Sequence, residues 1–455
     1  MDWQNKKITI LGLGRSGLAS ARALAELGAL LCLSDSKPDA EIEAMVADLP
    51  RERVRIEGGG HSLASLDAEM LVLSPGVPVD LPIVQAAIAD GVQVIGEIEL
   101  AYLLRHDVPY VAITGTNGKT TTTTLVGELL NGCGMRAPVG GNIGVPLVDL
   151  VKAPADALVA EVSSFQLETI ATFRPRVAAF LNFTDDHLNR HGTREVYWAM
   201  KCRIFENQTP DDTAVLNADD PAVASLEGKL KSRVILFSAV RPLAEGVVVE
   251  NEWIVYRTAS GPTPVMPVAE IQLRGRHNLE NCLAGVAVAA ALGLPFEGVR
   301  RVIAGFKAVE HRIEPVATVG GALFVNDSKG TNYDATVKAI EAFDEPLVLI
   351  AGGRDKGGAI DPLVEAIAKR VKHTVLVGEA APYFERVLRA AGYSALTLAD
   401  GFEAGVRAAL DQAGTGDVVL FSPACTSFDM FKNYEERGRV YKSIVHQLAG
   451  QPAQQ

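Results

Sequence analysis

Long apolar runs, dense clusters of one charge and paired cysteines are all missing from this 455-residue chain. No stretch reaches the about eighteen uncharged apolar residues that a membrane-spanning helix needs, so we expect a protein without a membrane span. The net charge is −12 and no group of Lys and Arg is dense, which argues against a nucleic-acid-binding protein. Cysteines that lie far apart without a CxxC pair suggest neither a zinc site nor a disulfide framework. We expect free thiols in a reducing cytoplasm at all five positions: Cys32, Cys133, Cys202, Cys282 and Cys425.

What the chain does contain is a repeated switch between short apolar strands and helical stretches of about ten to fifteen residues. This alternation predicts an α/β protein built from parallel sheets covered by helices. Nucleotide-binding patterns begin near Lys7, Val111 and Leu347. We therefore predict three domains: a Rossmann-like N-terminal domain (1–98), a central domain of the phosphate-loop ATPase type (99–308) and a Rossmann-like C-terminal domain (309–455).

The most informative motif is AITGTNGKTTTTT, an apolar strand that runs into a glycine-hinged turn and then a helix. Gly115 and Gly118 allow backbone N–H groups to approach an anion, and Lys119 and the positive end of the helix face the same anion. The Thr120 hydroxyl is then placed to ligate magnesium. Because Ile113 stands where the general pattern has glycine, the loop is of the compact TGTNGKT type. An ordinary strand-to-helix turn is the alternative.

A second glycine turn, GLGRSG, follows the first strand, and the next strand ends at Asp35. This pattern ordinarily indicates NAD, with the acidic side chain on the ribose hydroxyls. Hydride transfer has no use for a phosphate loop with a lysine in the next domain, so a different nucleotide-containing ligand is favoured. A purely structural turn remains open. The Ser74-Pro75-Gly76 segment ends another strand at a level suited to the same crevice.

Polar side chains also follow two strands near the phosphate loop. Glu161 ends an apolar strand, where a nucleotide-binding sheet holds its magnesium, although a solvated glutamate is the alternative. The next strand ends at Asp185-Asp186-His187. A lone histidine is more often structural, yet its position at a strand end makes His187 an equal candidate for a ligand, while we expect His191 to be structural.

Seven separate motifs resemble the Mur ligases, and together they cover nearly the whole chain. They are the GTNGKT loop, Gly140-Gly141-Asn142, EVSSFQLE, TDDHLNRHG with Lys201, Arg276-His277-Asn278 with Asn281, His311-Arg312, and NDSKGTN at 326–332. The end segments GLGRSG and SPACTSFDMFKNYEERG are most similar to members that add D-glutamate. The resemblance implies an ATP-dependent ligase that joins D-glutamate to UDP-N-acetylmuramoyl-L-alanine through an acyl phosphate in cytoplasmic peptidoglycan precursor synthesis. A folylpolyglutamate synthetase-like ligase and a non-enzymatic ATP switch are the alternatives.

The resemblance also assigns catalytic and metal-binding roles. Lys119, Glu161, His187 and Lys201 are the implied catalytic residues. Thr120 and Glu161 would hold one Mg2+, and His187 with Lys201 would lie at a second. The family carries a carbamate on the lysine at the Lys201 position, whereas the residues alone favour a lysine on a surface helix. We expect the YWAMKCRIFEN stretch that contains it to be helical.

The remaining binding residues are carried over in the same way. For ATP they are Gly115, Thr116, Asn117, Gly118, Lys119, Thr120, Thr121, Asn278, Asn281, Arg312 and Asp327. For the substrates they are Ser16, Asp35, Ser36, Ser74 and Gly76 on the uracil nucleotide, Asn142 and Ser163 near the phosphate loop, and Lys329, Thr331, Lys356, Ser427, Phe428 and Tyr434 on the D-glutamate and acceptor side. Two lysines suit a ligand with two carboxylates. Lys37 replaces an arginine of some relatives, and Tyr434 replaces a more usual phenylalanine. We expect a monomer.

Overall fold

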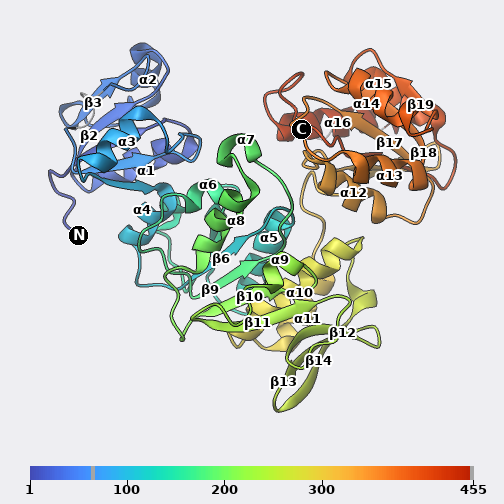
Figure 1. Cartoon of the computed structure of the whole chain (residues 1–455), viewed down its shortest axis with the longest axis horizontal. Coiled ribbons are helices and arrows are strands. Elements are labelled where there is room, and N and C mark those ends of the chain that lie inside the picture. Colours follow the sequence, from blue (N-terminus) through green and yellow to red (C-terminus); the bar gives the residue numbers. More distant parts are fainter. Residues whose placement is uncertain (63–66, 451–455) are drawn as a thin grey trace. The chain divides into compact units, whose positions relative to one another are not determined.

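The computed structural model describes residues 1–62 and 67–450, and in this part three sheets follow one another along the chain (Figure 1). The chain divides into two compact units. The first comprises Met1–Phe183, His187–Pro267 and Asn281–Ile303, and the second comprises Thr184–Asp186, Val268–Glu280 and the chain from Ala304 onward. Among the helices described, none combines the length and the apolar character needed to cross a membrane.

The N-terminal sheet is parallel, with the strand order β3-β2-β1-β4-β5. Its strands are β1 Lys7–Leu11, β2 Leu30–Ser34, β3 Val54–Glu57, β4 Met70–Leu73 and β5 Gln93–Gly96, and its helices are α1 Arg15–Glu26, α2 Asp39–Met45, α3 Pro82–Ala89 and α4 Glu97–Leu104. The central strand β1 has β2 on one side and β4 on the other, so the chain order reverses there. Ligands of such sheets bind at this switch point, where the GLGRSG turn joins β1 to α1.

The second sheet has the order β14-β13-β12-β11-β10-β9-β6-β8-β7, parallel from β12 to β7. The strands are β6 Tyr110–Thr114, β7 Val139–Gly141, β8 Leu158–Glu161, β9 Val177–Phe180, β10 Thr213–Asn217, β11 Arg233–Ser238, β12 Gly246–Glu250, β13 Trp253–Thr258 and β14 Gly261–Pro267. The helices are α5 Lys119–Gly132, α6 Ser164–Leu167, α7 Leu188–His191, α8 Arg194–Cys202, α9 Pro221–Ala224, α10 Arg276–Ala291 and α11 Phe296–Gly305. The buried β6 lies between β8 and β9, so the phosphate loop also leaves a switch point.

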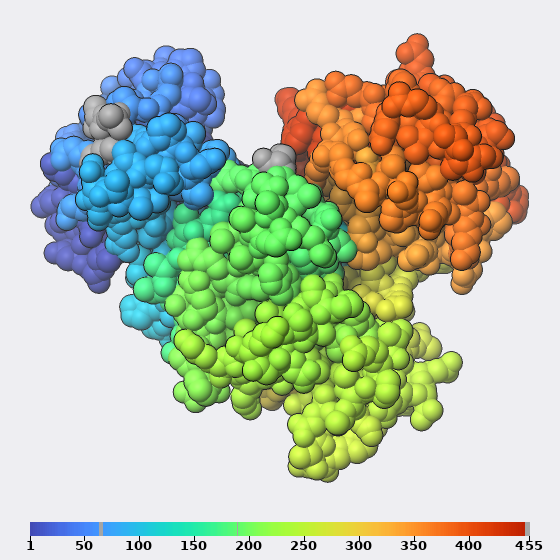
Figure 2. Space-filling view, in the orientation of Figure 1, coloured from blue at the N-terminus to red at the C-terminus, as the bar shows by residue number. Residues whose placement is uncertain are grey.

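Two antiparallel strands, β13 and β14, end the second sheet and form a yellow-green projection in Figure 2. The outer strand β14 carries Pro262, Pro264 and Pro267. Proline has no backbone N–H to donate, so this edge resists pairing with the edge of another sheet.

One hydrophobic core joins the N-terminal and second sheets within the first unit. It contains Ile8 of β1 and Leu24 of α1, which belong to the N-terminal sheet and its helices, together with Ala112 and Phe180 from the second sheet. Helix α4, which directly follows β5, contributes Ile98 to the same core. The two sheets are therefore bound into one body by shared apolar burial.

The C-terminal sheet has the order β15-β16-β20-β17-β18-β19, with only the β15–β16 pair antiparallel among the described strands. The strands are β15 Glu314–Val319, β16 Ala322–Asn326, β17 Leu347–Gly352, β18 Val371–Val377, β19 Leu396–Leu398 and β20 Val418–Phe421, and the helices are α12 Tyr333–Glu341, α13 Asp361–Arg370, α14 Ala381–Ala390, α15 Phe402–Gln412 and α16 Tyr434–Leu448. Leu349 packs in a core with α12, α13 and α14, whereas its neighbour Ile350 packs in a core with α15 and α16 (Figure 1). Helices thus cover both faces, as the sequence predicts.

Candidate active site

The phosphate loop is built from two glycines with left-handed or extended positive φ angles. Gly115 has φ +156° and Gly118, which precedes α5, has φ +82°. A Cβ atom on Gly118 would collide with the side-chain oxygen of Asn281. That oxygen also accepts a hydrogen bond from the Thr122 hydroxyl (3.1 Å), so Asn281, one of the residues predicted for ATP, lies beside the loop.

Asn182 fixes the shape of the loop from the neighbouring strand end. Its backbone oxygen accepts from the Thr116 N–H (3.0 Å), and its side-chain amide exchanges two hydrogen bonds with the Asn117 backbone (2.8 and 3.0 Å). Asn182 follows β9, the strand beside β6. The sequence analysis misses this residue, because it lies within the stretch predicted as the strand that ends at Asp185, whereas β9 already ends at Phe180.

Two lysine ammonium groups converge on one carbonyl oxygen of the loop. Lys119 donates to Gly115 O at 2.9 Å and to Thr116 O at 2.8 Å, and Lys201 donates to the same Gly115 O at 2.7 Å. The Lys201 side chain comes from α8 and is 1% exposed. Two like charges on one acceptor repel each other strongly where water is excluded. The predicted helix is correct, but a surface position for this lysine is wrong.

Tyr197 lies close to both Lys201 and His187, the two residues predicted for the second magnesium. Its ring lies 4.9 Å from the Lys201 ammonium and 6.2 Å from the His187 ring, and its hydroxyl is 3.3 Å from the Thr116 hydroxyl. It is one helical turn before Lys201 on α8. That spacing places both on one helix face and is the signal that could have identified Tyr197 from the sequence.

Glu161 presents an unsatisfied carboxylate oxygen at the end of β8, next to the phosphate loop strand. Its register partners are Ile113 on β6 and Gly141 on β7, and the residue is 2% exposed. Oε1 accepts from the Asn142 amide (2.7 Å), while Oε2 is buried without a hydrogen-bond partner in the described structure. A buried carboxylate oxygen without a partner is costly unless a ligand such as a metal ion satisfies it.

The donor set at this position fits magnesium. Thr120, at the start of α5 after β6, brings a hydroxyl oxygen to the same sheet edge as the Glu161 carboxylate of β8. No group of three or more His, Cys, Asp or Glu side chains in the described ranges forms a complete metal site. Magnesium is commonly held by one or two carboxylates together with substrate phosphates and water, so a partial protein site is what this ion requires.

His187 and His191 occupy different environments on α7. His187 precedes the helix with φ +55° and packs against the Phe165 ring at 4.9 Å. His191 is buried, and its Nε2 lies 2.9 Å from the Ser164 hydroxyl. Burial, aided by the nearby charges of Arg190 and Lys201, lowers the pKa of His191 to about 4. A neutral, buried ring agrees with the structural role expected for His191.

Ser163 caps the short helix α6 that follows Glu161. Its side chain accepts from the Gln166 N–H (3.3 Å), and the Gln166 side chain accepts from the Ser163 N–H (3.0 Å). This reciprocal capping box fixes the turn after β8.

All five residues predicted for the uracil nucleotide line one pocket of about 490 Å³ at the switch point of the N-terminal sheet. They are Ser16, Asp35, Ser36, Ser74 and Gly76. Burial opposes the charge on Asp35, but N–H donation from Leu13 and Lys37, with the nearby Lys37 ammonium, lowers its pKa below the ordinary value. Asp35 therefore stays anionic beside the glycine turn. Lys37 lines the same pocket.

In the second unit, Asp327 follows β16 and is almost fully buried. It accepts from the Ser422 hydroxyl (2.7 Å) and from the Ile313 N–H (3.3 Å), and burial raises its pKa to about 7. Arg312 lies between His311 and Ile313, both of which have positive φ (+66° and +44°). For a β-branched residue such as Ile313 this conformation is strained.

The residues predicted for D-glutamate also lie at the carboxyl ends of the C-terminal strands. The Lys329 ammonium lies 3.6 Å from the centroid of the Tyr434 ring. Lys356 follows β17 and lies 3.5 Å from a carboxylate oxygen of Asp186. Ser427 is buried, whereas the adjacent Phe428 is 61% exposed. The Thr331 N–H donates to Lys329 O (2.8 Å), which closes the loop after β16.

Arg437, which the sequence analysis misses, ties these loops together. Its side chain is 1% exposed and donates to Ser328 O (2.8 Å), to the Ser328 hydroxyl (3.1 Å) and to Cys425 O (3.2 Å). Burial lowers the pKa of Arg437 to about 10. Arg437 stands in the SPACTSFDMFKNYEERG segment that carries the resemblance, but only the folded chain brings its three acceptor atoms together, so its role cannot be read from that segment.

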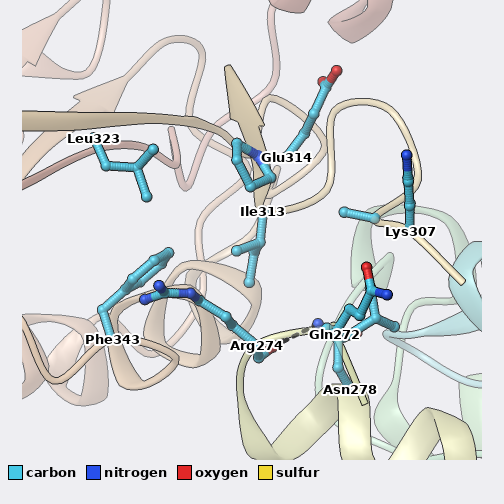
Figure 3. Close-up of a pocket in the computed structure, with 11 residues that line it drawn as sticks. Gln272, Arg274, Asn278, Lys307, Ile313, Glu314, Leu323 and Phe343 are labelled. Carbon is cyan, nitrogen blue, oxygen red and sulfur yellow. Dashed lines mark hydrogen bonds between the residues drawn. The ribbon is translucent and has the colours of Figure 1, made fainter. Parts of the chain in front are cut away.

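Asn278 lines a pocket of about 410 Å³ within the second unit (Figure 3). Its amide donates to Arg274 O (2.7 Å), and the Arg274 guanidinium lies over the Phe343 ring and pairs with Glu345 (2.6 Å). The predicted ATP residues are thus divided: Asn281 lies beside the loop in the first unit, whereas Asn278, Arg312 and Asp327 belong to the second.

Comparisons with known proteins cover nearly the whole chain. Residues 6–96 match the family model for the Mur ligase MurD-like N-terminal domain, residues 113–289 the Mur ligase middle domain, and residues 311–425 the Mur ligase glutamate ligase domain. Proteins called UDP-N-acetylmuramoylalanine--D-glutamate ligase are similar over almost their full length. The one from Pelotomaculum thermopropionicum is 47% identical (98% of this chain, 99% of the relative), and the one from Clostridioides difficile is 41% identical (98% and 100%).

Two solved structures share the fold at low identity. A pseudomurein peptide ligase type C from Methanothermus fervidus has a TM-score of 0.61 at 20% identity, covering 98% of this chain and 100% of its own. A UDP-N-acetylmuramate-alanine ligase from Thermotoga maritima has a TM-score of 0.60 at 19% identity, covering 98% and 99%. Both confirm the predicted α/β architecture.

Proposed function

This chain belongs to the Mur ligase family, and we propose that it joins D-glutamate to the alanine of UDP-N-acetylmuramoyl-L-alanine while ATP is converted to ADP and phosphate. The observation that carries this proposal is the 47% identity to a ligase of that name over 98% of the chain. The enzyme class is an ATP-dependent, amide-bond-forming ligase of peptidoglycan synthesis. Free cysteines suit the reducing cytoplasm, where we place the reaction, and we expect a monomer.

The reaction needs two steps because a carboxylate is a poor electrophile. The alanine carboxylate first attacks the γ-phosphorus of ATP, which gives an acyl phosphate and ADP. The amine of D-glutamate then attacks the acyl carbon, the amide bond forms, and phosphate leaves as the amine loses a proton.

The first step brings two anions together, so the site must supply positive charge. The Lys119 ammonium and the N-terminal end of α5 would supply it to the phosphates. Thr120 and Glu161 would hold magnesium, with the open Glu161 Oε2 as the ligand atom. Magnesium, when bound there, would supply further positive charge to the phosphates.

We also propose that Lys201 carries a carbamate. A neutral amine adds carbon dioxide and releases one proton, so a cation becomes an anion with two oxygens. The support is geometric: Lys119 and Lys201 share the Gly115 carbonyl, and this repulsion favours one uncharged amine. An anion at this position would complement Lys119 and a second magnesium near His187.

For the D-glutamate side we propose Lys329, Thr331, Lys356, Ser427, Phe428 and Tyr434. Two ammonium groups match two carboxylates, and the Tyr434 ring holds the Lys329 ammonium in place before the ligand arrives. Arg312 and Asp327, with Asn278, would reach ATP from the second unit.

A coupled phosphate-release assay tests the proposal. We expect turnover only when ATP, UDP-N-acetylmuramoyl-L-alanine and D-glutamate are all present, with L-glutamate and D-aspartate inactive. Turnover with a folate acceptor would favour the folylpolyglutamate synthetase-like alternative, and phosphate release without either substrate would favour an ATP switch.

Glu161→Gln is expected to raise the Mg2+ concentration for half-maximal activity by about tenfold or more, because a neutral amide is a much weaker magnesium ligand. The matched control is Glu97→Gln. Glu97 is also a buried glutamate of the first unit, and its Oε2 also has no described partner. It lines a different cavity, which residues 73–79 and the α6 segment also line. A Mg2+ titration of both variants decides the matter: an equal shift in the two would remove Glu161 from the metal site.

Lys356→Ala is expected to raise the KM for D-glutamate by about tenfold or more and the KM for ATP by less than about threefold. The reason is the loss of a charge-assisted hydrogen bond to a substrate carboxylate. Lys369→Ala, an exposed lysine on α13 of the same domain, is the control for altered surface charge. Equal effects on both substrates would assign Lys356 a different role.

A further inference from the structure

We propose that Arg190 is a positioning residue that holds the 74–79 loop of the uracil-nucleotide pocket against the α6 segment beside the phosphate loop. This inference rests on the proposed function, because it assumes an acceptor that spans both sites. Arg190 belongs to α7, one turn after His187. No role was assigned to it from the sequence.

Arg190 is anchored on the α6 side by two contacts. Its guanidinium donates to both carboxylate oxygens of Glu168 (2.7 and 3.3 Å), and its side chain lies over the Phe165 ring at 5.2 Å. The side chains of Arg190 and Glu168 are only 15% and 6% exposed. An ion pair that has two hydrogen bonds and is shielded from water fixes the orientation of the guanidinium as well as its distance from the carboxylate.

The same guanidinium also contacts the 74–79 loop. Its Nη2 donates to the backbone oxygen of Val77 at 2.9 Å. Val77 belongs to the 74–79 loop, whose N-terminal end is fixed separately because the Ser74 hydroxyl donates to Gly12 O (2.6 Å). Arg190 therefore links the Gly12 turn and Ser74, both in the uracil-nucleotide pocket, to the segment that follows Glu161.

The two linked segments are close neighbours elsewhere along their length. Residues 73–79 and 165–169 line one small cavity of about 10 Å³, which leaves room for no more than a water molecule. The nearby Gly96 N–H donates to Thr169 O (3.3 Å). The contact of Arg190 is thus part of a closely packed junction within the first unit.

This junction matters because the acceptor is long. Its uracil nucleotide would occupy the first pocket while its alanine carboxylate must reach the phosphate loop, so the two sites need a fixed separation. Small errors in the placement of reacting groups lower rates strongly. Without Arg190, Val77 O loses its charged donor, and the Glu168 carboxylate loses its two-point partner.

The chain offers a matched control in Arg203. This arginine also grips the α6 segment, because it donates to Leu167 O (2.8 Å), Glu168 O (2.5 Å) and Ile170 O (2.7 Å) and pairs with Glu206 (2.9 Å). Among the described residues it has no hydrogen bond to the 74–79 loop. Arg203→Met therefore disturbs the same segment without disturbing the proposed link.

The experiment compares Arg190→Met, Arg190→Lys and Arg203→Met by the dissociation constant of UDP-N-acetylmuramoyl-L-alanine without ATP, by the KM of each substrate and by thermal unfolding. We expect Arg190→Met to weaken acceptor binding about tenfold or more and to change the KM of ATP and D-glutamate by less than about threefold. Arg190→Lys keeps the positive charge but loses the planar guanidinium that donates several hydrogen bonds at once. We expect its acceptor binding to lie between that of wild type and that of Arg190→Met.

Arg203→Met should lower thermal stability without this selective loss. An equal loss of acceptor binding in Arg190→Met and Arg203→Met, or an equal rise in all three KM values, would overturn the proposal. If Arg190→Met does not fold, Arg190→Lys carries the same comparison. An inactive wild-type protein would contradict the proposed function itself, whereas an active wild type with unchanged acceptor binding in Arg190→Lys and Arg190→Met contradicts only this inference.

Discussion

Lys119→Ala is expected to lower kcat by about 10³-fold or more, which corresponds to about 4 kcal/mol in the barrier to phosphoryl transfer. The ammonium lies on the phosphate loop, where it donates to Gly115 O and Thr116 O, and it is not part of any apolar core. Its removal should therefore leave the thermal midpoint nearly unchanged. Phosphate release and thermal unfolding of the same preparation measure the two quantities.

Two further variants make this result specific. Lys229→Ala removes an exposed lysine of the same unit and should retain full activity. Lys119→Arg keeps the charge but replaces a compact ammonium by a planar fork, so we expect it to recover only a small part of the rate. A Lys119→Ala enzyme within about tenfold of wild type, or about 1.4 kcal/mol, would contradict the phosphate-loop assignment.

The parts of the site that the sequence predicts are those carried by local patterns. A strand, two glycines and a lysine specify the phosphate loop, because turn geometry and helix start depend on neighbouring residues only. Glu161 is predictable for a similar reason: parallel strands end at one edge of a sheet, so a polar residue after an apolar strand lies near that edge. The family resemblance, now confirmed, extends these predictions to the whole chain.

The contacts that hold the site together are not local. Asn182 reaches the phosphate loop because β9 pairs with β6, although 65 residues separate it from Asn117. Arg190 and Val77 are 113 residues apart, and Arg437 and Ser328 are 109 apart. The order of the strands in each sheet decides which of these partners meet, and that order cannot be read from a single sequence.

The domain organisation is also predictable only in part. The alternation of strands and helices predicts three α/β domains, and the described residues form three sheets. It does not reveal that the N-terminal and second sheets share one core, because the apolar residues that join them look like any other buried residues. The boundaries near 98 and 309 stay predictions.

Lys201→Ala is expected to be nearly inactive, with kcat lowered by about 10³-fold, and to regain part of its activity with acetate or formate. The residue is 1% exposed, and its ammonium contacts Gly115 O and the Tyr197 ring, so its removal leaves a buried space beside the phosphate loop. A short carboxylate can place two anionic oxygens where the carbamate would have placed them. Thermal unfolding of the variant separates lost chemistry from lost structure.

The rescue must be selective to support a carbamate. Lys119→Ala should not respond to either carboxylate, because its missing group is a cation, and wild type should be unaffected. Wild type grown or incubated with ¹³C-bicarbonate should show a carbamate carbon by NMR that Lys201→Ala lacks. Two ammonium groups on one buried carbonyl are unfavourable, whereas an anion beside Lys119 and magnesium is stabilised. Absence of both the rescue and the ¹³C signal would therefore leave Lys201 as a structural ammonium and refute the carbamate.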